Sequence, residues 1–407
     1  MTGTGVIDNM SAKKIPFIVL CASGLLAIFS STISKSPVLP LFTEHLGAGP
    51  AGVGVIAGIS AFTGIIASIP AGILSDVWGR KRMLILSAVV FSTAPFLYLF
   101  VTKLWHLALV RFYHGLATAI FLPVAMATVA DLFKKERGEK MGWFSTSTLG
   151  GRFMAPLVGG TILGALAFNP GLGFQFVYLV CGIAGILALS LVILLPNPNT
   201  QERNVHTNKA RTSLKAVISD KNILITCAVE ASILFAYGTF ETFLPLYSKN
   251  IGLSAYEIGI FLSAQIITLA LTKPVMGRFS DRHGRKPQIF LGSMIGSLCI
   301  GSFFFFQSFI ALLILSICFG FCLSIVTSAT SAFIADLSRQ GTRGSAMGTL
   351  GSIMDIGHTT GPVAAGIIAA YFGMGYSFIG ASLVLVLMAM LFLTGVMLGS
   401  TSPIMRE

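Results

Sequence analysis

The sequence predicts an all-α integral membrane protein of twelve transmembrane helices, in two six-helix bundles related by a pseudo-two-fold axis along the membrane normal. Three observations predict this class. The chain of 407 residues is 54% hydrophobic and only 10% charged. Apolar runs long enough to cross roughly 30 Å of hydrocarbon recur along it. A charged motif that begins at Gly72 begins again at Gly277, which is 205 residues later.

Each apolar run is predicted to be a helix, because a backbone amide in lipid needs a partner within its own segment. Several runs exceed ~20 residues, so tilting is expected. The predicted spans cover residues 15–37, 52–75, 83–102, 105–132, 141–167, 174–195, 222–247, 256–278, 288–306, 309–333, 344–371 and 375–399.

The repeated motif reads GILSDVWGRK at Gly72–Lys81 and GRFSDRHGRK at Gly277–Lys286. The same offset, with one inserted residue before the later pairs, relates many further positions, among them Pro40 and Pro245, Gly115 and Gly320, Asp131 and Asp336, and Pro156 and Pro362. The chain is therefore built from two copies of one unit, which in a membrane protein favours a transporter.

A polar, basic stretch divides six predicted spans from six. We expect an N-terminal six-helix bundle over residues 1–196, a cytoplasmic linker over 197–220 and a C-terminal six-helix bundle over 221–407. Both repeats start on the same side of the membrane, so they are predicted to be parallel repeats.

The net charge of +12 is distributed as expected for a membrane protein rather than for a nucleic-acid-binding one. On this topology 21 of the 27 Lys and Arg residues fall on one side, whereas the other face holds only Lys103 and Lys249. The positive-inside rule places both termini in the cytoplasm of a multi-pass protein of the inner or plasma membrane. The first thirteen residues are polar, so no cleavable signal peptide is expected.

The repeated motif is predicted to form a tight turn that acts as a conformational latch, or else only stabilises that turn. An aspartate at a helix C-terminus is unfavourably placed on its own helix. Asp76 is therefore expected to meet a nearby arginine or the start of the predicted helix 344–371, and Asp281 the start of 141–167. The latch residues are Gly72, Asp76, Gly79, Arg80 and Lys81, with Gly277, Asp281, Gly284, Arg285 and Lys286.

With this motif in both halves, the chain resembles the major facilitator superfamily over essentially its full length. The segment Leu107-x-x-x-Arg111-Phe-Tyr-His114-Gly115 resembles the family's second motif, whose arginine the resemblance implicates in proton coupling. Another segment is similar to the antiporter motif, with Ala155 in place of a glycine, and is echoed in the second half. The matching residues are Gly151, Pro156, Gly159, Gly160, Gly361 and Pro362. This motif implies the twelve-helix drug:proton antiporter group.

One departure from that group concerns its first helix. Many drug antiporters of the family carry an acidic residue there, whereas the interior of the predicted helix 15–37 has Lys35, and Glu44 lies at the outer end. Another carboxylate is therefore expected to titrate, unless coupling works differently.

Ionisable residues inside the membrane are costly and become functional candidates. Glu230 and Glu241 lie eleven residues apart on one predicted helix, hence on one face and about 16 Å apart along its axis. Glu230 is the first candidate proton carrier, although a buried ion pair would explain it too. Lys35 and Glu241 are candidates for an outer gate, with snorkelling of Lys35 as the alternative.

The remaining candidates come from both halves. Arg111 and His114 are predicted neighbours on one helix face, with backbone hydrogen bonding and packing as alternatives. Arg152 and His358 occupy equivalent repeat positions, and Asp355, one turn from His358, is expected to set its charge. The expected proton-coupling residues are Glu230, Glu241, Arg111, Asp355 and His358, and the expected substrate cavity includes Arg111, His114, Arg152, Phe121, Phe235, Tyr237 and Phe240.

These residues predict a secondary transporter that works by alternating access and exports small amphipathic or drug-like molecules in exchange for protons. A symporter or uniporter of a small organic anion or metabolite is one alternative, and a non-transporting membrane sensor is another. No nucleotide-binding loop or nucleophile–base pattern stands out, so neither ATP-driven pumping nor an enzyme is expected. We expect no metal site and no cofactor beyond the proton gradient, and a monomer whose partners are substrate, protons and lipid.

Overall fold

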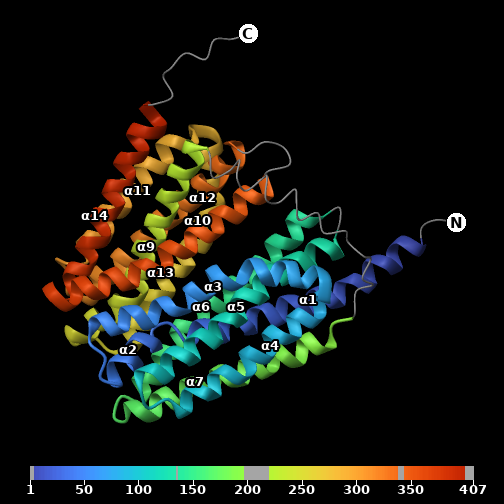
Figure 1. Ribbon diagram of the computed structural model, residues 1–407, viewed down its shortest axis with the longest axis horizontal. Helices are drawn as coiled ribbons and strands as arrows, with labels where there is room; N and C mark the ends of the chain where they lie inside the picture. The colour runs from blue at the N-terminus through green and yellow to red at the C-terminus, as the bar shows by residue number, and fades with distance from the viewer. Residues whose placement is uncertain (1–3, 134–135, 197–219, 338–342, 399–407) are drawn as a thin grey trace, which may run out of the picture. The chain divides into compact units, whose positions relative to one another are not determined.

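The computed structural model describes residues 4–133, 136–196, 220–337 and 343–398, and every regular element in these ranges is a helix. The first part of the chain (Figure 1) contains α1 (Thr4–Ile33), α2 (Val38–His45), α3 (Pro50–Trp78), α4 (Arg80–Leu97), η1 (Tyr98–Phe100), α5 (Leu104–Leu132), α6 (Arg137–Ala165) and α7 (Pro170–Leu194). The second part contains α9 (Lys221–Asn250), α10 (Ala255–His283), α11 (Arg285–Ser302), α12 (Phe309–Leu337), α13 (Arg343–Phe372), α14 (Met374–Phe392) and η2 (Leu393–Leu398).

The predicted all-α membrane class is confirmed. Within the described ranges, each predicted span overlaps one long helix. Nine helices of the described residues are long and apolar enough, by length and composition, to cross a membrane. The long helices α6, α11 and α13 are not among them. Glycine, serine and threonine are frequent in α6 and α13, and α11 has only 18 residues, which begin with Arg285, Lys286, Pro287 and Gln288.

The structure differs from the sequence prediction at the first span. The run 15–37 was expected to be one helix, but α1 ends at Ile33 and a separate short helix, α2, begins at Val38. Pro37 precedes α2, and a residue before proline is disfavoured in the helical conformation. The helix therefore stops before this proline, although the apolar pattern continues.

The chain divides into two compact units. Unit 1 comprises Met1–Leu46 and Thr63–Val205, and unit 2 comprises Gly47–Phe62 and His206–Glu407. The division passes through α3, since the first part of that helix groups with unit 2. There a Cβ atom added at Gly54 would lie 2.2 Å from the carbonyl oxygen of Pro362 on α13. The predicted bundle boundaries remain a prediction, and the predicted linker lies almost wholly outside the described residues.

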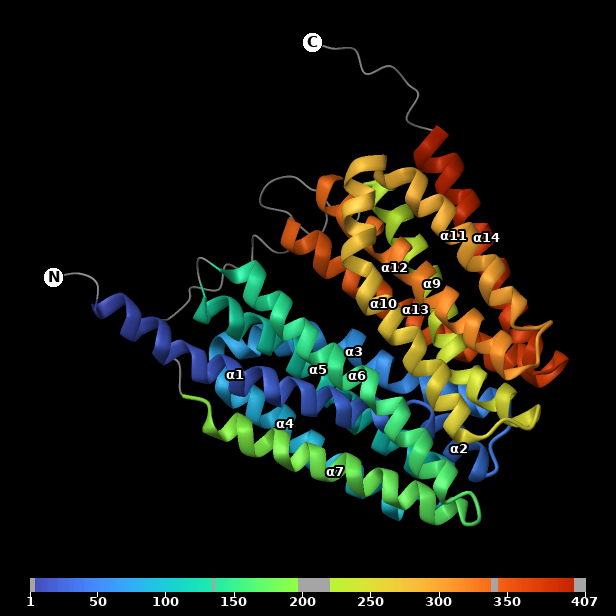
Figure 2. The same ribbon diagram turned by 180° about the vertical axis from the view of Figure 1, so that it is seen from behind.

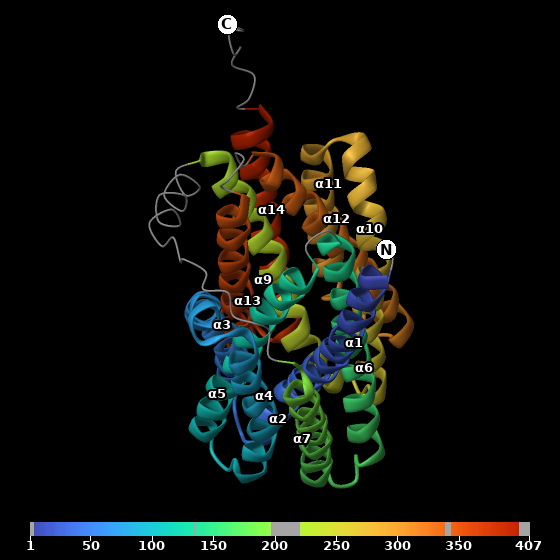
Figure 3. The same cartoon turned by 90° about the vertical axis from the view of Figure 1, so that its right-hand side faces the viewer.

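Helix packing inside unit 1 is repeated inside unit 2. In unit 1, α1 packs on α6 and α7, and α4 packs on α5 and α7 (Figure 2). In unit 2, α9 packs on α13 and α14, and α11 packs on α12 and α14 (Figure 3). The helices that pack together in unit 1 are thus the repeat equivalents of those that pack together in unit 2.

Glycines bring the paired helices into backbone contact. A Cβ atom at Gly151 of α6 would lie 2.3 Å from the carbonyl oxygen of Leu25 on α1. The equivalent Gly357 of α13 would place its Cβ 2.1 Å from the carbonyl oxygen of Ala231 on α9. Only a residue without a Cβ fits at such crossings, which is how small residues hold membrane helices together.

Candidate functional site

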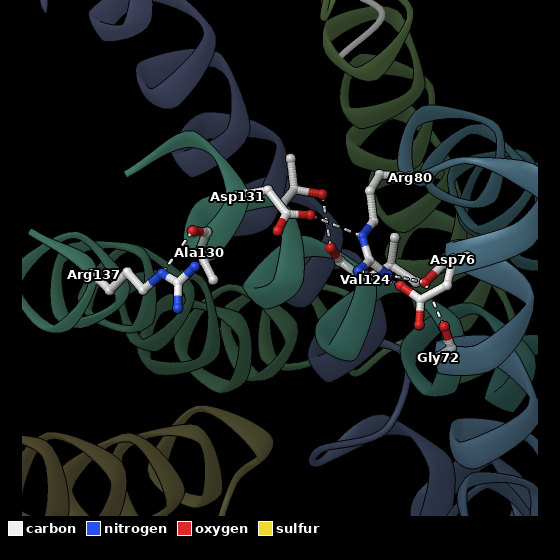
Figure 4. Close-up of polar contacts among 9 residues, drawn as sticks. Gly72, Asp76, Arg80, Val124, Ala130, Asp131 and Arg137 are labelled. Atoms are coloured by element: carbon white, nitrogen blue, oxygen red, sulfur yellow. Dashed lines mark hydrogen bonds and ion pairs between the residues drawn. The ribbon is translucent and has the colours of Figure 1, made fainter. Parts of the chain in front are cut away.

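The turn that joins α3 to α4 carries the first ion cluster (Figure 4). Gly79 makes the turn with φ of 94°, a conformation that favours glycine. The next residue, Arg80, forms an ion pair with Asp76 at 2.5 Å and donates from Nε to Asp131 of α5 at 3.3 Å. It also donates to the hydroxyl of Ser75, which in turn donates to the Gly72 carbonyl. The planar guanidinium group has several N–H donors that point in different directions, so it can bind all three acceptors at once.

Unit 2 repeats both ion pairs with the same atoms. The contact with the neighbouring serine is not repeated, since among the described residues Nη1 of Arg285 and the Ser280 hydroxyl have no hydrogen-bond partner. Gly284 has φ of 93°, Arg285 pairs with Asp281 at 2.5 Å, and its Nε donates to Asp336 of α12 at 3.1 Å. Lys286 adds a hydrogen bond to the Val396 carbonyl at 2.9 Å. The expectation that Asp76 meets a nearby arginine is confirmed, and that arginine comes from the same turn. Asp281 pairs with the arginine of its own turn in the same way.

The sequence missed the third member of each cluster. Asp131 and Asp336 were recognised only as repeat positions, and that equivalence was the signal that could have found them. The expected contacts of Asp76 with the start of α13, and of Asp281 with the start of α6, join the two units and stay predictions. Arg137, at the start of α6, donates to the Ala130 carbonyl at 2.9 Å (Figure 4).

Inside unit 1, the two candidate residues of α5 share one partner. Arg111 and His114 are 3% and 2% exposed. Arg111 donates from Nη1 to the Tyr98 hydroxyl at 3.2 Å, and His114 Nδ1 lies 3.4 Å from the same oxygen. The Tyr98 ring stacks on Tyr178 of α7, with centroids 4.2 Å apart. The predicted proximity of Arg111 and His114 is thus present, and Tyr98, which the sequence analysis did not single out, joins them.

The antiporter-like segment of α6 lies against α1 and the start of α2. Gly151 touches the α1 backbone, and a Cβ at Gly159 would meet Ile33 and Val38 within 3.4 Å. In α13, a Cβ at Gly361 would lie 2.3 Å from the carbonyl oxygen of Phe235. The motif glycines therefore mark the face that packs on α1 in unit 1 and on α9 in unit 2.

Unit 2 brings two ionisable residues into direct contact. Glu241 of α9 and His358 of α13 are in direct contact, with Oε2 and Nε2 separated by 3.2 Å, and they form an ion pair when the imidazole is protonated. The carboxylate is 6% exposed, and the Tyr237 ring lies 5.4 Å from the imidazole. Asp355 had been expected to act on His358, and the structure adds Glu241 as its ion-pair partner. The pair joins residues 117 positions apart.

A second carboxyl group lies deeper in unit 2. Glu230 of α9 is fully buried, and its Oε2 contacts the hydroxyl of Thr330 on α12. Glu230 and Glu241 thus have different partners on different helices.

Other predicted site residues are spread over both units. Lys35 lies in the turn between α1 and α2, and Arg152 is half-buried on α6. The gating contact predicted between Lys35 and Glu241 would join the two units, so it stays a prediction. Phe121 and Phe240, expected to line a cavity, are fully buried in their own units: Phe121 packs on Phe91 and Phe240 on Phe303. Substrate contact would require these rings to be uncovered. Phe235 and Tyr237 are partly exposed.

Among the described residues, no group of three or more His, Cys, Asp or Glu side chains could hold a metal ion. The chemistry that the described sites offer is proton binding, ion pairing and hydrogen bonding.

Two helical units with repeated packing, ion clusters at their helix turns and buried ionisable groups in apolar helices define a membrane transporter. The sequence profile of the Major Facilitator Superfamily matches residues 20–264 and 234–403. The chain therefore belongs to this superfamily and is a multi-pass membrane transporter of small molecules rather than an enzyme.

Relatives and solved structures agree with this assignment. The chain is 27% identical over 349 residues to an uncharacterized transporter of this family from Methanocaldococcus jannaschii, covering 83% of this chain and 87% of that one. It is 26% identical over 363 residues to the multi-drug resistance efflux pump PmrA of Streptococcus pneumoniae, covering 85% and 88%. It is 27% identical over 347 residues to the multidrug resistance protein MdtG of Klebsiella pneumoniae, covering 83% of each.

Two solved structures share the fold. A bacterial homologue of the human lysosomal transporter Spinster superposes with a TM-score of 0.80 at 15% identity, covering 93% of this chain and 96% of that one. The nucleoside transporter NupG superposes with a TM-score of 0.76 at 15% identity, covering 94% and 98%.

Proposed function

We propose that this transporter exports small amphipathic or drug-like molecules across the inner or plasma membrane in exchange for protons. Relatives that carry the names of multidrug efflux proteins, at 26% and 27% identity, support export. The antiporter-like glycine and proline pattern of α6 supports exchange. Both termini are taken to be cytoplasmic and the working unit a monomer.

The observation that carries the proposal is the pair formed by Glu241 and His358. A carboxylate beside a neutral imidazole carries one negative charge, and the same pair with a protonated imidazole is neutral overall. Because charge inside a membrane is costly, the pair is most stable when a proton or another cation compensates the carboxylate. Histidine is the side chain whose charge changes near neutral pH.

Antiport follows if a proton and a substrate cannot both satisfy the pair. Protonation from the outside neutralises the pair and favours one conformation of the transporter. When the proton leaves, substrate from the cytoplasm or the inner leaflet binds and compensates the charge of the pair in its place. Each ligand shifts the balance only as far as it prefers one conformation.

The test measures proton movement driven by substrate. The purified protein is reconstituted in liposomes that contain a pH-sensitive dye, and gradients of cationic, neutral and anionic amphipathic compounds are imposed. Wild type is compared with Glu241→Gln and His358→Gln. The exposed Glu139 at the start of α6 provides the control, Glu139→Gln.

For wild type and the control, we expect at least one compound to drive protons in the opposite direction. Glu241→Gln is expected to reduce that proton flux by about tenfold or more, the effect of losing roughly 1.4 kcal/mol or more, while substrate-for-substrate exchange continues. Flux without proton movement would overturn the proposal. Protons that travel together with an anion would do the same and would favour a symporter in which Arg111 and Arg152 bind the anion.

A further inference from the structure

Glu230 and Thr330 form a buried contact between α9 and α12 that the ion-pair chemistry of Glu241 does not explain. Both side chains are fully buried. The Thr330 hydroxyl oxygen contacts Oε2 of Glu230 and also lies 2.9 Å from the carbonyl oxygen of Val326, one turn earlier on α12. This hydroxyl thus sits between two oxygen atoms.

The single hydrogen of the Thr330 hydroxyl determines whether the carboxyl group of Glu230 is protonated. A threonine hydroxyl has one hydrogen to donate, and a backbone carbonyl and an ionised carboxylate can only accept. Thr330 therefore cannot donate to both oxygens at once. Both contacts are hydrogen bonds only if Glu230 carries the proton, donates it to Thr330, and Thr330 donates to Val326.

A second observation agrees with the protonated form. Among the described residues, the other carboxyl oxygen of Glu230, Oε1, is buried and has no hydrogen-bond partner. An ionised carboxylate with one oxygen unsatisfied in an apolar interior is far more costly than a neutral acid.

Other ionisable groups lie near Glu230 on several of the helices that pack around it. Cys227 lies one turn earlier on α9, and Lys273 of α10 is within electrostatic range. Asp355 lies on α13, which packs on α9 at Ala231 through Gly357. An ionised Glu230 would be attracted by the ammonium group of Lys273.

We propose that Glu230 holds a proton in this conformation and that Thr330 is the positioning residue through which α12 responds when the proton leaves. The proposal rests on the proposed antiport and adds a residue to it. On deprotonation, the Glu230 O–H bond breaks and the proton passes to a water molecule. Thr330 then turns its single hydrogen to the carboxylate, and the Val326 carbonyl loses its side-chain partner.

This exchange gives α12 two discrete states. The bond from threonine to the carbonyl four residues earlier is known to influence helix bending. With the proton bound, that bond is made at Val326. Without the proton it is broken, and the contact between α9 and α12 becomes a stronger, charge-assisted one.

The first experiment reads the proton without any transport. Infrared difference spectra of purified protein in liposomes at neutral pH are compared for wild type and Glu230→Gln. We expect wild type to show a carboxylic-acid C=O band that Glu230→Gln removes. If Glu230→Gln removes a carboxylate band instead, Glu230 is ionised and the proposal is wrong.

The second experiment tests Thr330. Thr330→Val removes the hydroxyl at nearly constant shape, and Thr330→Ser keeps it. Thr226→Val is the matched control, because Thr226 is equally buried on α9 and donates to the carbonyl four residues earlier. Thermal unfolding verifies that each variant is folded, and Thr330→Ser serves alone if Thr330→Val is not.

We expect Thr330→Val to shift the infrared acid band and to raise the pH of half-maximal proton-coupled transport by about one unit, because the ionised carboxyl loses its hydroxyl donor. Thr330→Ser and Thr226→Val should behave like wild type. A Thr330→Val protein with an unchanged band and pH profile, or a Thr330→Ser protein that differs from wild type in both, would refute the role of Thr330. If the acid band is present but no compound moves protons, the antiport proposal fails while the protonated Glu230 stands.

Discussion

The helix turns of the two units resemble each other closely, whereas the interiors of their helices differ. At the turns, Arg80 meets two aspartates at 2.5 and 3.3 Å, and Arg285 meets two at 2.5 and 3.1 Å. In the interior of unit 1, a buried arginine binds a tyrosine. In the interior of unit 2, carboxyl groups contact a histidine and a threonine.

The difference distinguishes the structural role of the helix turns from the functional role proposed for the helix interiors. A turn that must hold two helices together poses the same physical problem in both units, so the same glycine, arginine and aspartates solve it twice. The proposed proton exchange does not need a titrating group in both units, and the repeat positions differ there. His358 of unit 2 corresponds in the repeat to Arg152 of unit 1, a residue whose charge is fixed.

The largest expected effect comes from breaking the repeated backbone contacts. Gly151→Ala and Gly357→Ala would each place a Cβ within 2.3 Å of a backbone carbonyl of the neighbouring helix, so both should lower the free energy of unfolding by about 1–3 kcal/mol. Thermal unfolding in detergent measures this. Gly150→Ala is the control, because its nearest atom is 3.8 Å away. Equal losses at Gly150 and Gly151 would contradict the packing argument.

A smaller effect should distinguish the two ion clusters. Asp76 and Asp131 are each 31% exposed, whereas Asp281 and Asp336 are 60% and 57% exposed. Water screens the second cluster more. We therefore expect Arg80→Ala to cost about 1–2 kcal/mol of stability and Arg285→Ala less than about 1 kcal/mol. Thermal unfolding and transport rates of the two variants measure the difference.

The outcome bears directly on the comparison between the units. If Arg285→Ala is the more damaging variant, burial does not set the strength of these clusters, and the similarity of their geometry is misleading. Arg80→Lys and Arg285→Lys serve as controls for charge alone, since lysine cannot present the planar fork of donors.

The smallest effect is expected in the interior of unit 1. Tyr98→Phe removes the hydroxyl that Arg111 and His114 share, and we expect transport to fall by less than about tenfold. The pH of half-maximal transport should not move, because the proton sites proposed here are in unit 2. Tyr113→Phe is the control, because the Tyr113 hydroxyl is hydrogen-bonded to the side chain of Thr93, at 2.9 Å. A shifted pH profile in Tyr98→Phe would place a titrating group in unit 1.

Much of the fold could be predicted from the sequence. Long apolar runs give the helices, because lipid leaves the backbone no other way to pair its amides. The motif at Gly72 and Gly277 gives the repeat, and glycine next to arginine gives the turns. The break between α1 and α2 was missed, because the apolar pattern continues past Pro37 and hides it.

The candidate site was predicted less completely. The sequence identified Glu230, Glu241, His358 and Arg111 as costly residues within apolar helices. It did not identify Thr330 or Tyr98, since a threonine or tyrosine in such a helix is unremarkable by itself. The lining residues Phe121 and Phe240 were chosen by position along the helix, and both prove to be buried inside their units.

The sequence by itself determined the helices, the repeat and the list of ionisable groups, because these depend on hydropathy and spacing along one chain. Only the tertiary structure decided that Glu241 meets His358 and that Glu230 meets Thr330, across 117 and 100 residues. The physical reason is the solvent. In water an apolar stripe marks the buried face of a helix, but lipid is as apolar as the protein interior. The sequence therefore leaves open which face of a helix packs and on which neighbour.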